Sequence, residues 1–251
     1  MSGFAFCCGF CFIFIFYTIF SSFLQLYFYE ARANDSDRWK IQSRKGNIGI
    51  NSSMIWLPLI ELFGIESKPN RAPDHAIFAT INLLIACLFA GAVASAASDG
   101  RTKLVFSLAD GGGLSGVLIW TLISILWQSV IEYYWHRLLH FPWLYKRFHK
   151  VHHHYTSPEP FDDMYIHPLE AFGYYCILYS PPFIMPLHVF GFVVYMAIMG
   201  TFGVLDHCGV RISFPGIYNS ADHDMHHSRF NVNYGFPFAF TDVIHGTYLA
   251  A

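Results

Sequence analysis

The segment "EYYWHRLLHFPWLYKRFHKVHHHYTSPEP", residues 132–160, carries six histidines within nineteen positions. It follows an apolar stretch that is long enough to cross a lipid bilayer. A polar side chain beside lipid costs free energy unless it has a partner. So many imidazoles in one place therefore need a common partner, and a metal ion is the candidate that imidazole nitrogens bind best.

The composition of the whole chain agrees with a membrane location. Of its 251 residues, 54% are hydrophobic and only 13% are charged, whereas about a quarter of the residues in soluble proteins are charged. The formal net charge is −2, so the chain lacks the basic surface expected of a nucleic-acid-binding protein. The sequence predicts a membrane protein whose partners lie in the lipid phase.

Three uninterrupted apolar runs are long enough to cross the bilayer as helices: residues 4–29, 76–97 and 114–134. A fourth region, residues 171–205, is broken by Pro181, Pro182 and Pro186, which predicts two short helices that form a hairpin. The shorter run 52–65 predicts an interfacial helix. The predicted fold is an all-α, multi-pass transmembrane bundle with a histidine-rich cap. Its parts are an N-terminal membrane region, residues 1–113, and a catalytic domain, residues 114–251.

Basic residues indicate the orientation of the spans. The loop 98–113 carries only Arg101 and Lys103, whereas the other 13 of the 15 Lys and Arg residues fall on the opposite side of the predicted bundle. Loops rich in Lys and Arg stay in the cytosol. The sequence therefore predicts a luminal amino terminus and places every histidine cluster on the cytosolic side.

The histidines of the second half form three spaced groups, which we call boxes. The first has the pattern H-x-x-x-H and the other two have H-x-x-H-H: His136 and His140; His149, His152 and His153; His223, His226 and His227. Positions i, i+3 and i+4 share one face of a helix, so we expect each box to point at one place. Eight nitrogen donors exceed the four ligands of one zinc ion, which indicates two ions or one ion with spare ligands. Iron, copper, zinc and nickel all accept imidazole.

Other polar residues near the boxes have candidate roles. His167 and His207 lie at helix edges on the cytosolic side, and each could complete a coordination sphere. His75 and His188 are interpreted as structural, and His154 as pointing away from the cluster. Carboxylates often accept the second N–H of a ligating imidazole, and four acidic residues flank the boxes: Glu132, Asp206, Asp222 and Asp224.

The three boxes, placed in this order after hydrophobic spans, resemble the fatty acid hydroxylase and sterol desaturase superfamily of membrane di-iron oxygenases. The resemblance covers residues 114–248, and "HPLEAF" (167–172), "PLHV" (186–189) and "NYGFPFAFTDVIHGTY" (233–248) are most similar to the sterol C-5 desaturase, or lathosterol oxidase, branch. It implies metal ligation by the eight box histidines, with His207 and His167 filling further positions. His245 stands where many members have Phe and is left out of this set.

The resemblance also implies two Fe ions, O2 as co-substrate, cytochrome b5 as electron donor and a location in the endoplasmic reticulum membrane. The expected reaction is desaturation or hydroxylation of a lipid, with a sterol favoured. Fatty-acyl or alkylglycerol hydroxylation within the same superfamily remains open, as does a membrane zinc hydrolase, because zinc-bound water could attack an ester or amide. We expect a substrate pocket beneath the metals, walled by the third span and the hairpin, with Trp127, Tyr134 and Tyr175 as candidate aromatic walls.

The predicted orientation can be tested with engineered glycosylation acceptors. An acceptor near Gly100 should be modified because loop 98–113 is predicted to be luminal, and an acceptor near Ser157 should remain unmodified. The gel mobility of the two proteins before and after deglycosylation gives the result. Modification near Ser157 would place the histidine boxes in the lumen.

Overall fold

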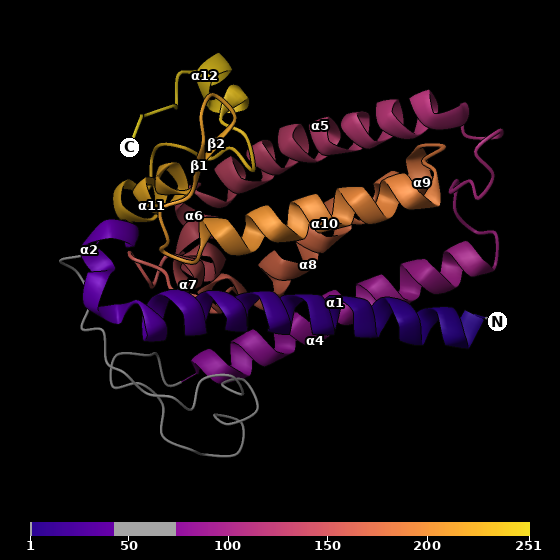
Figure 1. The fold of residues 1–251 in the computed structure, drawn as a ribbon. Helices are drawn as coiled ribbons and strands as arrows, with labels where there is room; N and C mark the ends of the chain where they lie inside the picture. Colours follow the sequence, from indigo (N-terminus) through magenta and orange to yellow (C-terminus); the bar gives the residue numbers. More distant parts are fainter. Residues whose placement is uncertain (1, 43–73) are drawn as a thin grey trace.

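The computed structural model describes residues 2–42 and 74–251, and these residues are mostly helical (Figure 1). Within them, four helices are long and apolar enough to cross a membrane: α1 (Ser2–Leu24, extended by a π-helical segment, Gln25–Ala31), α4 (His75–Ser98), α5 (Gly113–Leu139) and α10 (Val189–Asp206). The predicted all-α, multi-pass fold is confirmed. The interfacial helix predicted for residues 52–65 lies outside the described residues.

The sequence explains where the long helices begin and end. No charged residue falls within α4, and a helix satisfies its own backbone polar groups, so both its side chains and its backbone can lie in lipid. Helix α5 continues past the predicted end at residue 134 and ends at Leu139, with His140 as its C-cap. Phe141 precedes Pro142 and adopts an extended conformation, as the residue before a proline favours. The last turn of α5 therefore carries His136.

The region of the predicted hairpin contains α8 (Pro168–Leu178), α9 (Pro181–Ile184) and α10. Its second arm is longer than predicted, because the prolines lie in the turn and leave the 18 residues of α10 uninterrupted. The turn contacts the loop between α4 and α5, where the Val105 N–H donates to the Leu187 carbonyl at 3.0 Å. The hairpin thus runs the whole depth of the bundle.

Apart from α9, the short elements of the second half gather at one end of the long helices, on the left in Figure 1. We call residues 140–167 and 207–248 the histidine cap. It contains α6 (Pro142–Leu144), the π-helix Tyr145–His149, α7 (Lys150–His152), the 3-10 turn Asp162–Met164, β1 (Ser213–Phe214), β2 (Tyr218–Asn219), α11 (Ser220–Arg229) and α12 (Phe240–His245). The two strands pair antiparallel, with Ser213 opposite Asn219.

The N-terminal region is attached to the cap by polar contacts from α1, from its π-helical extension and from the chain at the end of α2 (Ser36–Trp39), which follows the 3-10 turn Ala33–Asp35. The Tyr17 hydroxyl donates to Asp163 at 2.6 Å, and the Tyr29 hydroxyl donates to the Cys208 carbonyl at 2.7 Å. Lys40, which is 1% exposed, pairs with Glu159 at 3.0 Å. A buried charge needs such a partner, so this pair fixes the segment after α2 against the cap.

Helices α1 and α4 approach closely because glycines face the contact. A Cβ atom on Gly9 would lie 2.6 Å from the Ala90 carbonyl oxygen, and one on Gly91 would lie 2.8 Å from the Phe6 ring. Small residues allow this close packing between helices in membranes, where dispersion contacts replace the hydrophobic effect.

Replacing Gly9 by Leu should therefore separate α1 from α4 and destabilise the protein by about 1–3 kcal/mol, the usual cost of overpacking. Thermal unfolding of the purified protein in detergent measures the change. Gly3→Leu is the matched control on the same helix, because a Cβ atom on Gly3 would meet no other atom within 4 Å. Equal stability of the two variants would contradict the close α1–α4 contact.

Candidate metal centre

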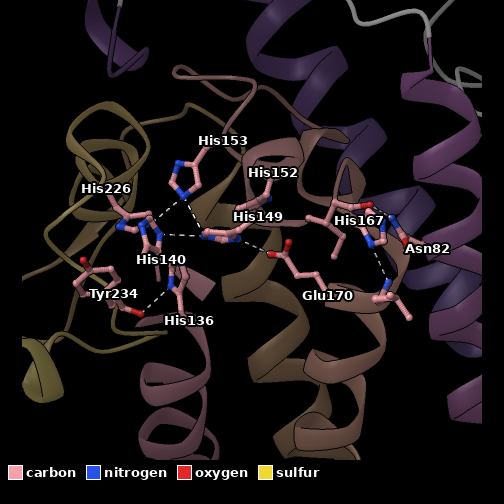
Figure 2. A network of polar contacts seen from close by, with 12 residues as sticks. Asn82, His136, His140, His149, His152, His153, His167, Glu170, His226 and Tyr234 are labelled. Carbon is pink, nitrogen blue, oxygen red and sulfur yellow. Dashed lines mark hydrogen bonds and ion pairs between the residues drawn. The ribbon is translucent and has the colours of Figure 1, made fainter. Parts of the chain in front are cut away.

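Nine of the ten histidines predicted as ligands lie in two groups, which are formed by the histidine cap and by His136 in the last turn of α5. The first group contains five residues: His136, His140, His149, His153 and His226. The second contains four: His152, His207, His223 and His227. Within each group, one ring nitrogen per residue lies within 4.8 Å of all the others. Figure 2 shows the first group, with rings from α5, the π-helix and α11 turned toward one another.

The second and third boxes are each divided between the two groups. His149 and His153 contribute to the first group, whereas His152 contributes to the second. On α11 the division is reversed, because His226 joins the first group while His223 and His227 join the second. The expectation that each box points at one place is therefore wrong for the second and third boxes, whereas His136 and His140 of the first box both join the first group. One helical turn instead supplies both groups, so the two groups lie side by side.

The spacing of the ring nitrogens fits metal coordination. In the first group, the His149 Nε2 atom lies 2.9 Å from that of His140 and 3.0 Å from that of His153. In the second, the His207 Nε2 atom lies 2.9 Å from that of His223. Two nitrogens held about 2.1 Å from one ion at right angles lie about 3 Å apart. The Nε2 atoms of His136 and His227 are buried without a hydrogen-bond partner, which leaves both free to bind an ion.

Four of the opposite ring nitrogens have backbone acceptors, whereas the Nδ1 atoms of His152, His153 and His223 are buried without a hydrogen-bond partner. The Nδ1 atoms donate to backbone carbonyls in four histidines: His136 to Tyr234 (2.9 Å), His207 to Gly203 (2.9 Å), His226 to Val232 (2.6 Å) and His227 to Tyr155 (3.1 Å). A hydrogen bond from Nδ1 fixes the tautomer and leaves the Nε2 lone pair for a metal. Two loops, the one after α7 and the one after α11, and helix α10 therefore orient these rings.

A carboxylate does perform this role, but it is Glu170 rather than the four predicted residues. Its Oε1 atom accepts from His149 Nδ1 at 2.6 Å, and both side chains are fully buried (Figure 2). The predicted carboxylates accept from other groups: Glu132 from Gln128, Asp206 from Tyr218, Asp222 from Asn219 and Asp224 from Gln42. An acidic residue in the first turn of an apolar helix was the signal that could have identified Glu170.

His167 lies outside both groups. Its Nδ1 atom accepts from the Leu169 N–H at 3.2 Å and caps α8. His188 does the same at α10, where it accepts from the Phe190 N–H at 3.1 Å. His75 contacts Asp162 at 3.2 Å, and His245 contacts Tyr134 at 3.0 Å. These four histidines therefore cap helices or contact Asp162 and Tyr134, and they lie outside the two groups formed by the nine clustered histidines.

Burial keeps the clustered imidazoles neutral. Loss of solvation lowers the pKa of His207 to about 4. Loss of solvation, together with the repulsion that a protonated His140 would meet from a protonated His136, lowers the pKa of His140 to about 2. The same loss of solvation, reinforced by neighbouring imidazoles, lowers the pKa of His152, His223 and His226 well below the ordinary histidine value. Neutral rings have the free lone pair that a metal ion requires.

An apolar cavity of about 200 Å³ lies directly beneath the two groups. His136, His152, His207 and His223 form its upper end, and α1, α5, α8 and α10 form its walls. Tyr175 lines the cavity, as predicted for the substrate pocket. Trp127 and Tyr134 do not line it: both are exposed on α5, and they contact Ser180 and His245 respectively.

Comparison with known families agrees with this arrangement. The fatty acid hydroxylase family matches residues 121–247, about half of the chain, and this range contains all nine clustered histidines. The chain belongs to this family. The resemblance predicted from the three boxes is therefore confirmed.

Several curated proteins of related function are similar to the chain. It is 35% identical over 151 residues to a Delta(7)-sterol 5(6)-desaturase of Gibberella zeae, which covers 60% of this chain and 43% of that protein. Human lathosterol oxidase is 35% identical over 136 residues, 52% of this chain and 46% of that protein. Human fatty acid hydroxylase domain-containing protein 2 is 35% identical over 126 residues, 50% and 37% respectively. The matches span less than half of each relative. No solved structure matches the chain.

Replacing His226 by Ala should remove a nitrogen from the first group and release its metal, so metal content per chain should fall and turnover should be lost. Metal analysis of the purified protein measures this. His167→Ala is the matched control, because it removes an imidazole that caps a helix outside both groups. Unchanged metal content in His226→Ala, or an equal loss in His167→Ala, would contradict the ligand assignment.

Proposed function

We propose that this protein is a membrane di-iron oxidoreductase that uses O2 and external electrons to desaturate or hydroxylate a lipid, with a sterol as the favoured substrate. The observation that carries the proposal is the pair of adjacent histidine groups above an apolar cavity. Membership of the fatty acid hydroxylase family supports the same chemistry.

The nine clustered histidines would hold the two ions, five at one and four at the other. When bound, iron supplies the oxidising power that lets dioxygen break an unactivated C–H bond. Neutral, all-nitrogen ligands also suit zinc, so the ligands by themselves leave the metal open. The family membership and the oxidisable character of an apolar substrate both favour iron over the zinc of a hydrolase.

The reaction balances with an outside electron donor. Desaturation removes two hydrogen atoms from neighbouring carbons and, with two electrons and two protons from the donor and solvent, reduces O2 to two water molecules. Hydroxylation uses the same electrons and protons, but one oxygen atom enters the C–H bond and the other leaves as water. The chain's own residues would exclude bulk water, hold the substrate and keep the imidazoles oriented through Glu170 and the backbone carbonyls.

Sequence similarity favours a sterol. Several relatives are named as sterol 5(6)-desaturases or lathosterol oxidase, and their identity to this chain is 30–37%. The second candidate is a fatty-acyl or alkylglycerol hydroxylase, which the similarity to fatty acid hydroxylase domain-containing protein 2 favours. Both substrates are lipids with one polar end.

The electron donor would be a protein such as cytochrome b5 at the cytosolic face of the endoplasmic reticulum membrane. The asymmetry of Lys and Arg residues supports this orientation. The histidine cap also carries exposed basic residues at Lys146, Arg147 and Lys150, which complement an acidic donor. Arg101 and Lys103 lie at the opposite end, in the loop before α5.

Expression in a cell that lacks sterol C-5 desaturation tests the proposal. Sterol profiling should find the ring double bond restored, and His226→Ala, expressed at the same level, should leave the profile unchanged. Metal analysis should find about two irons per chain, one for each histidine group. Zinc together with turnover in the absence of oxygen would contradict the oxidoreductase.

Profiling fatty acids and ether lipids in the same cells separates the two candidate substrates. New hydroxylated acyl chains with an unchanged sterol profile would assign the protein to the second candidate. Cleaved ether lipids would indicate an alkylglycerol substrate.

A further inference from the structure

A second apolar space lies farther from the histidines. It has a volume of about 610 Å³ and runs between α1, α4 and α10 toward the loop after α4. Its walls include Cys8 on α1, Ala94 on α4 and Val193 on α10, and Phe106 closes its far end. Phe106 and Val193 are exposed on the surface that the bundle presents to lipid. We call this space the far groove.

The far groove adjoins the cavity beneath the histidines. Four residues line both spaces: Phe12 and Ile13 of α1, Tyr179, and Met196 of α10. The order of residues along α10 also shows that the two spaces adjoin, because residues 196–204 line the cavity whereas residues 189–196 line the groove. The two spaces therefore follow one another along the same helix, and Met196 marks the neck between them.

The combined path nearly matches the hydrocarbon core of a bilayer. Helix α10 has 18 residues, which corresponds to about 27 Å at a rise of 1.5 Å per residue. The core of a bilayer is about 30 Å thick. A molecule that follows the whole path would extend from the histidines almost to the opposite leaflet.

The two ends of the path differ in polarity. At the histidine end, the cavity wall contains Gln128 with its partner Glu132, and Tyr17 with its partner Asp163. Apart from Cys8, Gly9, Ser98 and Tyr179, the far groove is lined by Ala, Val, Leu, Ile, Met and Phe side chains, and none of its described lining residues is charged. Burying a hydroxyl there would cost free energy, because the lining offers it few partners. A lipid with one polar end therefore has a preferred direction.

We propose that the cavity and the far groove form one lipid-binding path, in which the substrate's polar end lies near the histidines and its hydrocarbon tail passes between α1 and α10 into the far groove. The inference rests on the proposed function and adds the direction of binding to it. It also means that oxidation occurs in the part of the lipid nearer its polar end.

The path gives the N-terminal region a role in specificity. Helices α1 and α4 lie outside the range 121–247 that matches the family, yet they supply Phe12, Ile13 and Ala90 to the walls. Space within the path comes from small residues on α10, such as Ala197, Gly200 and Gly203. A Cβ atom on Gly203 would approach nothing closer than 3.8 Å. Helices α1 and α4 would therefore limit the length of the tail that can bind, whereas residues of the matched range 121–247 would contact the end of the lipid that is oxidised.

Photo-crosslinking in membranes tests the direction of binding. One probe is a sterol that keeps its ring hydroxyl and carries a diazirine at the end of its side chain, and the second carries the diazirine on the ring next to the hydroxyl. Mass spectrometry of the labelled chain should place the tail label on far-groove residues such as Ala94 and Val193. It should place the ring label near Glu132. Reversed labels, or the same labels from both probes, would overturn the proposal.

Variants of α10 provide the control. Met196→Trp should obstruct the neck and reduce far-groove labelling by at least about tenfold, because a bulky side chain removes the tail's apolar contacts. Phe190→Trp is the matched change, since Phe190 is 64% exposed and lines neither space. Equal labelling of the two variants would contradict a path through the neck.

Labelling requires no turnover, so it separates the two proposals. Correct labels without oxidised product would contradict the proposed function and leave the path intact. Oxidised sterol from a protein with no far-groove label would contradict only the path.

Discussion

Nine imidazoles packed into two adjacent groups, seven of them buried, impose the constraint on which the rest of the cap depends. A buried imidazole is costly to protonate, and its lone pair is costly to leave without a partner. Here the Nε2 atoms crowd to about 3 Å from one another, and those of His136 and His227 have no hydrogen bond. A metal ion at each group would satisfy several of these lone pairs at once. The packing of the cap therefore suits metal binding.

This constraint explains the irregular backbone around the site. The carbonyls of Val232 and Tyr234 orient His226 and His136, so the loop after α11 must present two oxygens to two rings. Phe230 and Asn233 in that loop have positive φ angles of 69° and 54°. Residues other than glycine rarely adopt positive φ angles, and such a backbone conformation persists where surrounding contacts hold it in place. The Asn233 side chain is held by the carbonyls of Asp222 and Leu249.

The N-terminal helices do more than anchor the chain in lipid. Buried contacts join them to the cap, among them Asn82, which donates to the carbonyls of Met164 and Ile166 at 2.9 and 2.7 Å. These carbonyls belong to the segment that leads into α8, and α8 carries Glu170. The position of the carboxylate that orients His149 therefore depends partly on α4. Helix α1 closes one side of the cavity.

The amino-acid sequence by itself determined the membrane-spanning helices and the metal-binding residue type. A charge-free run of about 20 residues must form a helix in lipid, and three boxes of histidines at helical spacing indicate shared metal ions. Sequence spacing could not assign His152 and His153 to different groups, because adjacent residues on a short, partly π-helical segment diverge in direction. Nor could the sequence show that His207 joins a histidine group and that His167 does not, because each lies at the end of an apolar helix: His167 precedes α8 and His207 follows α10. Only the tertiary structure brings His207 against α11 and Glu170 against His149, because each contact joins elements whose packing depends on the whole bundle.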